Sequence, residues 1–358
     1  MFTLNTGEVS VKAEREKQFD SLRKQVGRTP LIEIQYPKLE NGNRLFAKCE
    51  FLNPTYSHHD RQYVELFYEA EKSGSITPGV TPIIETTSGS AGISFAWIAK
   101  ELGYDATVIV PSELPSSRIE DIKKFGGKLI ISEGKYLLGS INKLKTILLD
   151  DRDKQGDKSK RYYFINHSRK EVSSLALESI ATETLEQCPE CNTYIGILGS
   201  GSSISGPAKV FLDSGVNVVA WEPFGSAHGF DQQNPSEYLE LFGIKPGEIP
   251  HNIFGGSFVG ADFPHINSSV EMLKNKIVLV ADQYQISNYE KFISDNGLNN
   301  PDKLINNVRS LIQWDKIDPF SLPVGYTSLG NLAVALNYSK TTSNEKIVIV
   351  LYDPITRY

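Results

Sequence analysis

Cysteine is scarce in this chain, with three residues in 358. Cys49, Cys188 and Cys191 are too few for a disulfide framework, and their number is consistent with a reducing compartment. Cys188 and Cys191 make a single CxxC motif, with no second CxxC and no Cys or His close behind it. We therefore expect incidental surface thiols here rather than half of a zinc site or a redox pair, and we predict no metal site.

The chain also lacks long apolar runs and clusters of basic residues. Its longest nearly apolar stretches, such as residues 347–352, are far shorter than the roughly 20 residues of a membrane-spanning helix. The N-terminal segment is polar, without the apolar region of a signal peptide. Lysine and arginine number 37 against 43 acidic residues, and no basic block is present to grip a phosphate backbone. We expect a cytoplasmic protein that binds neither nucleic acid nor a membrane.

From residue 45 onward, short β-branched or apolar runs alternate with amphipathic stretches. This periodicity predicts repeated βα units with a mostly parallel sheet, and the length of the chain favours two lobes. We expect strands at residues 45–51, 82–87, 106–111, 128–132, 162–166, 194–198, 216–222 and 346–352. We expect helices at residues 60–73, 91–102, 117–125, 138–150, 170–187, 207–212 and 329–338. The helix at 91–102 is apolar nearly all round, so it should be buried.

Two loops rich in glycine and hydroxyl residues each connect an expected strand to an expected helix. The first is TTSGSAG at residues 86–92. Glycine lets the backbone turn tightly, hydroxyls form hydrogen bonds, and the free amides of a helix N-terminus carry partial positive charge. The loop suits a carboxylate or a phosphate. Taken alone, it is explained equally well as a helix cap without a ligand.

The second loop is GSGSSISG at residues 199–206, after the strand expected at 194–198. It offers another nest of amides and hydroxyls, which suits a dianion. It is not a Rossmann fingerprint, because the third glycine of GxGxxG would fall on Ile204, and no Walker lysine follows. Two such loops in one βα chain favour anion binding over turn chemistry alone.

These loops and the segments around them resemble the fold type II pyridoxal-phosphate family, which includes cysteine synthase, cystathionine β-synthase and tryptophan synthase β. VGRTPLI at 26–32, KCEFLNP at 48–54 and SHHDR at 57–61 resemble the family's GxTPL, KxExxNP and SxKDR segments. VGYTSLG at 324–330 and residues 347–357 resemble its VGISSGA turn and its closing VVVLPDSGERY strand. The similarity covers residues 26–358. It implies an α/β fold of two lobes, each a mostly parallel twisted sheet flanked by helices, and a homodimer.

The hydrophilic stretch at residues 150–161 predicts an exposed connection at the boundary between two lobes. We expect a smaller lobe of residues 46–155, a candidate for movement, which carries the first loop. The larger lobe would comprise residues 1–45 and 156–358 and carry the second loop.

The resemblance implies roles for residues at the two loops and at two turns. The substrate carboxylate would be held by Thr87, Ser88, Gly89, Ser90 and Ala91. The phosphate of the cofactor would be held by Gly199, Ser200, Gly201, Ser202 and Ser203. Thr327, with Ser328 beside it, would face the pyridine nitrogen. His228, Gly255 and Gly256 are candidates for the pocket wall, although an exposed histidine and a plain glycine turn would look the same.

The departures from the family pattern lie mainly at the reactive end of the site. His59 stands where the family has its cofactor lysine, Ser90 replaces an asparagine, Ala91 a threonine and Ser202 a glycine. Imidazole cannot form the imine through which a lysine amine holds pyridoxal phosphate. If pyridoxal phosphate binds, we therefore expect it to bind non-covalently.

Three interpretations of His59 remain open. The protein still performs amino-acid chemistry without the lysine, or it has kept a ligand pocket and lost catalysis, or it is an engineered lysine variant. The changes at Ser90 and Ala91 favour a naturally altered site. His59 would be a general base or a space-filler, and Lys48 is a less favoured source of an amine. Since His58 and His59 are neighbours on a backbone taken as extended, we expect them to point to opposite sides.

The function that these features favour is binding of pyridoxal phosphate or a related phosphorylated ligand, with β-replacement or β-elimination on a small amino acid. One alternative is a catalytically inactive, ligand-sensing or regulatory homologue, which senses an amino acid or phosphorylated metabolite or pairs with an active relative. Another is an enzyme that uses the pocket for a different phosphorylated or nucleotide substrate. That last alternative is disfavoured, because no P-loop lysine or paired carboxylate motif for magnesium stands out.

Overall fold

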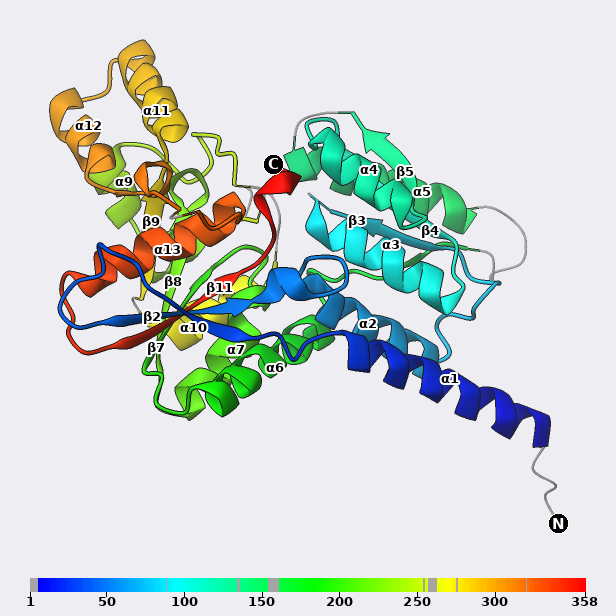
Figure 1. Ribbon diagram of the computed structural model, residues 1–358. Helices are drawn as coiled ribbons and strands as arrows, with labels where there is room; N and C mark the ends of the chain where they lie inside the picture. Colours follow the sequence, from blue (N-terminus) through cyan, green and yellow to red (C-terminus); the bar gives the residue numbers. More distant parts are fainter. Residues whose placement is uncertain are drawn as a thin grey trace.

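The computed structural model of the protein describes residues 6–87, 89–133, 136–153, 161–253, 255–256, 263–274, 276–319 and 321–358. The strands of this described part form two separate sheets, of which the larger lies to the left in Figure 1. This arrangement confirms the predicted α/β fold with two mostly parallel sheets flanked by helices.

The larger sheet has seven strands. Their order is β1 (Leu31–Ile34), β2 (Arg44–Cys49), β11 (Lys346–Leu351), β7 (Thr193–Ile197), β8 (Asn217–Pro223), β9 (Ile277–Ala281) and β10 (Ile312–Gln313). Only the pairing of β1 with β2 is antiparallel among the described pairs. The central strands are almost fully buried, as expected for β-branched runs that helices cover on both faces.

The smaller sheet has four parallel strands in the order β5 (Lys128–Ser132), β4 (Ala106–Pro111), β3 (Ile83–Thr86) and β6 (Tyr163–Phe164). Helix α3 (Ser90–Leu102) packs against this sheet and against α2 (His59–Lys72). Most of its residues are buried, which confirms the prediction drawn from its apolar surface.

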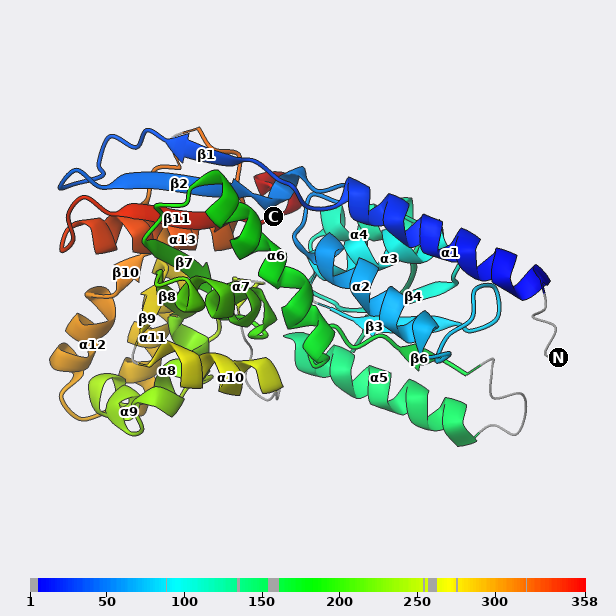
Figure 2. The ribbon, with the colours of Figure 1, turned by 90° about the horizontal axis from the view of Figure 1, so that it is seen from below.

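The other helices flank the two sheets. They are α1 (Thr6–Gln25), α4 (Ser116–Lys124), α5 (Tyr136–Asp153), α6 (Glu171–Gln187), α7 (Ser202–Asp213), α8 (His228–Gln233), α9 (Glu237–Phe242), α10 (Pro264–Leu273), α11 (Gln283–Asn296), α12 (Pro301–Arg309) and α13 (Tyr326–Ser339). Figure 2 shows α6 between the two sheets, and α1 and α2 side by side along the smaller one. Within the described residues, no helix is both long and apolar enough to cross a membrane.

The sheets divide the chain differently from the predicted lobe boundaries. Strand β2 pairs with β1 and β11 in the larger sheet, so a boundary at residue 46 would cut through it. Strand β6 pairs with β3 in the smaller sheet, although it lies after residue 155. Strand β2 has the apolar pattern of any buried strand, and its partners lie far away in sequence. Local composition therefore could not assign it to a sheet.

Two further predictions are corrected by the structure, and several elements were missed. Helix α7 begins at Ser202 rather than at Pro207, since a proline in a helix removes one hydrogen bond without stopping it. Cys188 and Cys191 are each only 5% exposed and belong to the core beside the larger sheet, so they are not surface thiols. Strands β1, β9 and β10 and helices α1 and α8 to α12 were not expected from the sequence.

Candidate active site

A cavity of about 510 Å³ lies at the carboxyl ends of strands from both sheets. Parallel α/β sheets commonly place their ligands at this edge. Ten of the predicted site residues line it: His59, Thr87, Gly89, Ser90, Ala91, Ser200, Ser203, Gly255, Gly256 and Thr327. Gly199, Gly201, Ser202, Ser328 and His228 are not among its lining residues, and Ser88 lies outside the described residues.

The second glycine-rich loop leads directly into the first turn of α7. Gly201 has a φ of 95°, and a Cβ there would lie 2.3 Å from a backbone carbon of α10. A Cβ on Gly199 would lie 2.2 Å from the carbonyl oxygen of Gly255. Both positions therefore require glycine, and the turn brings Ser200 and Ser203 to the cavity at a helix N-terminus. This is a cradle suited to a phosphate.

His58 is a site residue that the sequence analysis missed. Its Nε2 lies 2.8 Å from the hydroxyl oxygen of Ser203 in the cradle. The prediction that His58 and His59 point to opposite sides is wrong, because the backbone here is already helical. Their ring centroids are 4.1 Å apart, and both rings line the cavity. Burial, followed by the neighbouring His59, lowers the pKa of His58 well below its ordinary value.

The hydrogen bonds of Gln62 determine which nitrogen of His59 carries the proton. The amide nitrogen of Gln62 donates to the carbonyl of Ser173 and to the hydroxyl of Ser202. Its Oε1, 2.5 Å from Nδ1 of His59, must therefore accept a hydrogen from that nitrogen. Burial, and then the nearby His167, lower the pKa of His59 to about 3. At neutral pH, His59 is an uncharged imidazole whose Nε2 keeps its lone pair.

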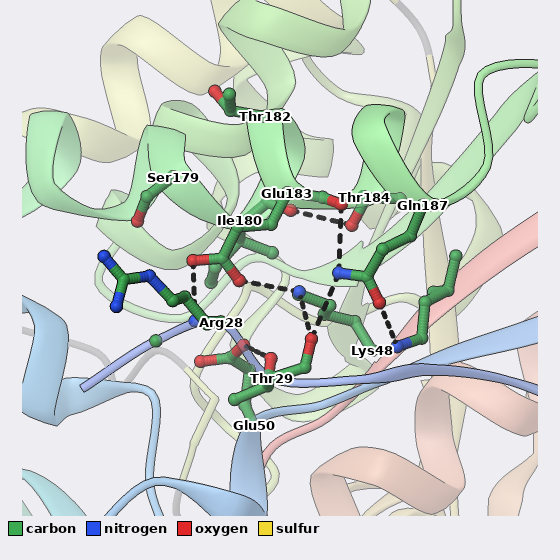
Figure 3. A network of polar contacts seen from close by, with 12 residues as sticks. Arg28, Thr29, Lys48, Glu50, Ser179, Ile180, Thr182, Glu183, Thr184 and Gln187 are labelled. Carbon is green, nitrogen blue, oxygen red and sulfur yellow. Dashed lines mark hydrogen bonds and ion pairs between the residues drawn. The ribbon is translucent and has the colours of Figure 1, made fainter. Parts of the chain in front are cut away.

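No buried lysine among the described residues lines the cavity. Lys48 is fully buried, but its ammonium group donates to the carbonyl of Thr29 at 2.6 Å and to Glu183 at 2.7 Å. Figure 3 shows these contacts, which keep Lys48 in a polar network outside the cavity lining. Lys145 on α5 lines the cavity, and it is exposed. Lys48 is therefore not a source of an amine in this arrangement.

The same network joins the start of α2 to α6 through Arg61. The guanidinium of Arg61 donates two hydrogen bonds to Glu50, both at 2.8 Å, and two to Glu183, at 2.6 and 2.8 Å. Burial alone would raise the pKa of Glu50, but the charge and hydrogen bonds of Arg61 outweigh it and lower that pKa. In Glu183, hydrogen bonds from Arg61 likewise outweigh burial and lower the pKa to about 2.

The lowered pKa of Glu183 predicts an acid-sensitive contribution to stability. Its carboxylate stabilises the fold fully above the ordinary value of 4.5, and this contribution is lost as the pH falls toward about 2. In urea unfolding from pH 7 to pH 3, the free energy of unfolding of the wild type should fall more steeply than that of Glu183→Gln. Parallel pH dependences would show that Glu183 is not stabilised in its charged form.

The first loop forms one hydrogen bond within itself and one to Asp353, which follows β11. The amide of Gly89 donates to Oγ1 of Thr87 at 3.1 Å, and the hydroxyl of Ser90 donates to Asp353 at 3.0 Å. The amide of Gly92 in the first turn of α3 already donates to the carbonyl of Gly89 at 2.9 Å, which leaves the amides of Ser90 and Ala91 for an anion at this helix start. The loop therefore still suits a carboxylate, although Ser90 is already engaged with Asp353.

Arg118 is a second cavity residue that the sequence analysis missed. It is 2% exposed, and its guanidinium lies 3.6 Å from Asp353 and 4.5 Å from the ring centre of Tyr358. A Cβ on Gly89 would lie 2.2 Å from one of its nitrogens, so only glycine permits this approach. A buried cation thus lies beside the predicted carboxylate loop. No spacing signal marked it, because the contact joins α4 to the far end of the chain.

Of the other predicted pocket residues, Thr327 lines the cavity, whereas Ser328 and His228 do not. Thr327 lines the cavity at the start of α13, where a Cβ on Gly255 would lie 2.7 Å from its hydroxyl oxygen. Ser328 instead accepts a hydrogen bond from the amide of Tyr352 at 2.9 Å, which is a structural role. His228 begins α8. The described residues contain no group of three or more His, Cys, Asp or Glu side chains arranged to hold a metal ion.

Comparison with known proteins places this fold and site in a family. The sequence profile of the family described as "Pyridoxal-phosphate dependent enzyme" matches residues 22–285. Cysteine synthase A from Salmonella typhi is 28% identical over 279 residues, which cover 76% of this chain and 80% of the relative. A probable cysteine synthase from Bacillus subtilis is 29% identical over 231 residues, covering 63% of this chain and 71% of the relative.

Solved structures share the fold over nearly the whole chain. A hydrogen sulfide-producing enzyme from Fusobacterium nucleatum superimposes with a TM-score of 0.71 at 24% identity, covering 95% of this chain and 99% of the other. An O-acetylserine dependent cystathionine beta-synthase from Helicobacter pylori does so with a TM-score of 0.69 at 22% identity, covering 94% and 96%. Both confirm the predicted two-sheet architecture of fold type II.

The chain therefore belongs to the family of pyridoxal-phosphate dependent enzymes, and the predicted cysteine-synthase-like resemblance is confirmed. The cofactor of this family is pyridoxal phosphate. The described residues fit its phosphate, since two obligatory glycines shape a cradle at the start of α7. The described residues that line the cavity include His59 and one lysine, Lys145, which is exposed.

Proposed function

We propose that the protein binds pyridoxal phosphate non-covalently in this cavity and uses it to replace or eliminate a β-substituent of a small amino acid. The observation that carries the proposal is the glycine-shaped cradle at the N-terminus of α7. The cradle faces a cavity that is lined by three imidazole side chains, those of His58, His59 and His167. Titratable groups gathered in one cavity are typical of catalytic sites.

Each part of the ligand has candidate partners in this proposal. The amides at the start of α7, with Ser200 and Ser203, would hold the phosphate, and His58 would contact it through the Ser203 hydroxyl. Thr327 would face the pyridine nitrogen. The start of α3 would hold the carboxylate of the amino acid, with Arg118 adding positive charge nearby.

His59 would have a limited role at the place of the absent lysine. When bound, pyridoxal phosphate supplies an electron sink for negative charge at Cα of the amino acid. Since imidazole forms no imine, His59 would not attach the cofactor, and its role would be limited to the amino group of the substrate. His59 offers the lone pair of Nε2, which would accept a hydrogen bond and orient that amino group.

The relatives support a small amino acid as the substrate, because several of them are named cysteine synthases. The alternative is a binding protein that holds the cofactor or a related phosphorylated ligand without turnover. The absence of a lysine at residue 59 favours this alternative, whereas the three imidazoles that line the cavity favour catalysis. Loss of the β-substituent from O-acetylserine, measured as release of acetate in the presence of pyridoxal phosphate, separates the two. Saturable binding without acetate release would leave only the binding function.

The cradle itself is tested by placing negative charge in it. Ser200→Asp should weaken binding of pyridoxal phosphate at least about 100-fold, because a carboxylate close to a phosphate in a partly buried site costs several kcal/mol. Quenching of tryptophan fluorescence gives the dissociation constant. Ser214→Asp, at the exposed far end of the same helix, adds the same charge outside the cavity and should bind within about threefold of the wild type. Equal affinities of the two variants would exclude the cradle as the phosphate site.

A further inference from the structure

Glu85 and His167 form a buried pair at the edge of the cavity. Glu85 on β3 is 1% exposed, and its Oε2 accepts the backbone amide of His167 at 3.2 Å. The same oxygen lies 3.3 Å from Nδ1 of His167. Asn166, with a φ of 63°, turns the chain after β6 and brings His167 onto this carboxylate. Asparagine tolerates this left-handed conformation better than most residues.

The carboxylate of Glu85 favours one proton position on the imidazole of His167. A carboxylate oxygen accepts hydrogen bonds, so its approach to 3.3 Å favours a proton on the nitrogen that faces it. Nε2 then keeps its lone pair and is the nitrogen that can act in the cavity, which the ring of His167 lines. The contact of 3.3 Å does not meet hydrogen-bond geometry, so Nδ1 of His167 is a buried nitrogen without a hydrogen-bond partner among the described residues. Such contacts are often long in ligand-free sites and shorten when the substrate binds.

His59 lies close by but has a different partner. Its ring centroid is 5.8 Å from that of His167, and both rings line the same cavity. The Nδ1 of His59 faces the neutral amide of Gln62, whereas that of His167 faces a carboxylate. A carboxylate stabilises the imidazolium that forms when a base takes up a proton, and an amide does so far less. The enclosed position of His59 opposes its charging, so it is a weak base.

We propose that His167, held by Glu85, is the general base of this site, and that His59 serves only as a hydrogen-bond acceptor. This assignment rests on the proposed function. The bond between Cα of the substrate and its hydrogen breaks, and the proton passes to Nε2 of His167. The electron pair would stay on the substrate at Cα, and pyridoxal phosphate, when bound, would supply the electron sink for it. Glu85 is a positioning residue, which keeps the other proton on Nδ1 and stabilises the charged ring.

The tautomers are tested first, in the protein without ligand. Long-range proton–nitrogen NMR spectra of ¹⁵N-histidine-labelled protein distinguish the two neutral forms of each of the six histidines, with His59→Gln and His167→Gln giving the assignments. At pH 7.5, neutral His59 and neutral His167 should both carry the proton on Nδ1. In Glu85→Leu, which removes both acceptor oxygens, His167 should lose this single tautomer while His59 keeps it. An Nε2-protonated His167 in the wild type would overturn the assignment.

Proton transfer is tested with L-alanine, which has no β-substituent to lose. With pyridoxal phosphate in D₂O, the loss of the Hα signal reports exchange, and a sample without protein gives the background rate. His167→Gln should slow exchange at least about 100-fold, the usual lower range for loss of a general base. His59→Gln should slow it less than about tenfold, since only a hydrogen bond is lost. His265→Gln, whose ring contacts a backbone carbonyl at 3.1 Å, is the matched control and should exchange at the wild-type rate.

The outcomes separate this inference from the proposed function. Absence of exchange above background in the wild type would contradict the chemistry itself. Exchange that survives in His167→Gln and disappears in His59→Gln would return the role of base to His59 and overturn the inference. The affinity of each variant for pyridoxal phosphate is measured by fluorescence alongside. An unchanged affinity with slow exchange in His167→Gln supports the assignment, and a loss of binding that accounts for the slow exchange contradicts it.

Discussion

Replacement of Arg61 by methionine is expected to destabilise the protein by about 3–5 kcal/mol, the usual cost of removing one partner from a buried ion pair. The side chain of Arg61 is 4% exposed and that of Glu50 is fully buried, so water cannot replace the lost hydrogen bonds. Methionine matches the unbranched stem of arginine as far as Nε and lacks the guanidinium carbon and its two terminal nitrogens. Urea unfolding followed by far-UV circular dichroism measures the change in the free energy of unfolding.

The destabilisation should come mainly from the unpaired carboxylate of Glu50. Adding Glu50→Gln to Arg61→Met should therefore restore part of the lost stability, because a buried amide needs less solvation than a buried charge. The surface pair of Arg309 and Glu290 provides the matched control, with side chains 58% and 31% exposed. Arg309→Met should cost less than about 1 kcal/mol. Equal effects of Arg61→Met and Arg309→Met would contradict a buried network.

Replacement of His59 by lysine is expected to create a covalent link to pyridoxal phosphate. The new amine would stand in the cavity at the start of α2, near Arg118 and Arg357, which also disfavour a positive charge at His59. Burial and these cations lower the pKa of a lysine, so part of it would be the neutral, reactive amine near pH 7. The variant should turn yellow with the cofactor, and borohydride should fix one cofactor per chain.

His228→Lys is the control for this prediction, because it adds the same amine at a residue outside the cavity lining. It should show no fixed cofactor beyond that of the wild type. A colourless His59→Lys protein that still binds pyridoxal phosphate would mean that residue 59 does not face the aldehyde.

The elements that carry the two loops could be predicted from the sequence. Strands β4 and β5 begin and end at the expected residues, because each has a short run of β-branched and aliphatic residues at its centre. The loops at residues 86–92 and 199–206 follow β3 and β7 as expected. A strand-to-helix loop rich in glycine and hydroxyl residues is recognised from neighbouring residues alone, so the sequence is enough to predict it.

The remaining site residues depend on contacts between distant parts of the chain. Arg118 meets Asp353 and Tyr358, and Glu85 meets His167, across separations that no periodicity records. The error about His58 and His59 had a different cause. The helix begins about one residue earlier than predicted, and this small shift brings both rings into one cavity. Boundaries of elements are the least predictable feature of a sequence, and here the boundary decides the site.

Borohydride reduction of the wild-type protein saturated with pyridoxal phosphate, followed by intact-mass measurement, tests the central claim most directly. The claim is that the cradle at the start of α7 holds this cofactor without a covalent bond to the chain. Fluorescence should report saturable binding before reduction, and the mass of the reduced and dialysed chain should equal that of the untreated chain. A stoichiometric mass increase that maps to one lysine would contradict the claim, and so would an absence of binding.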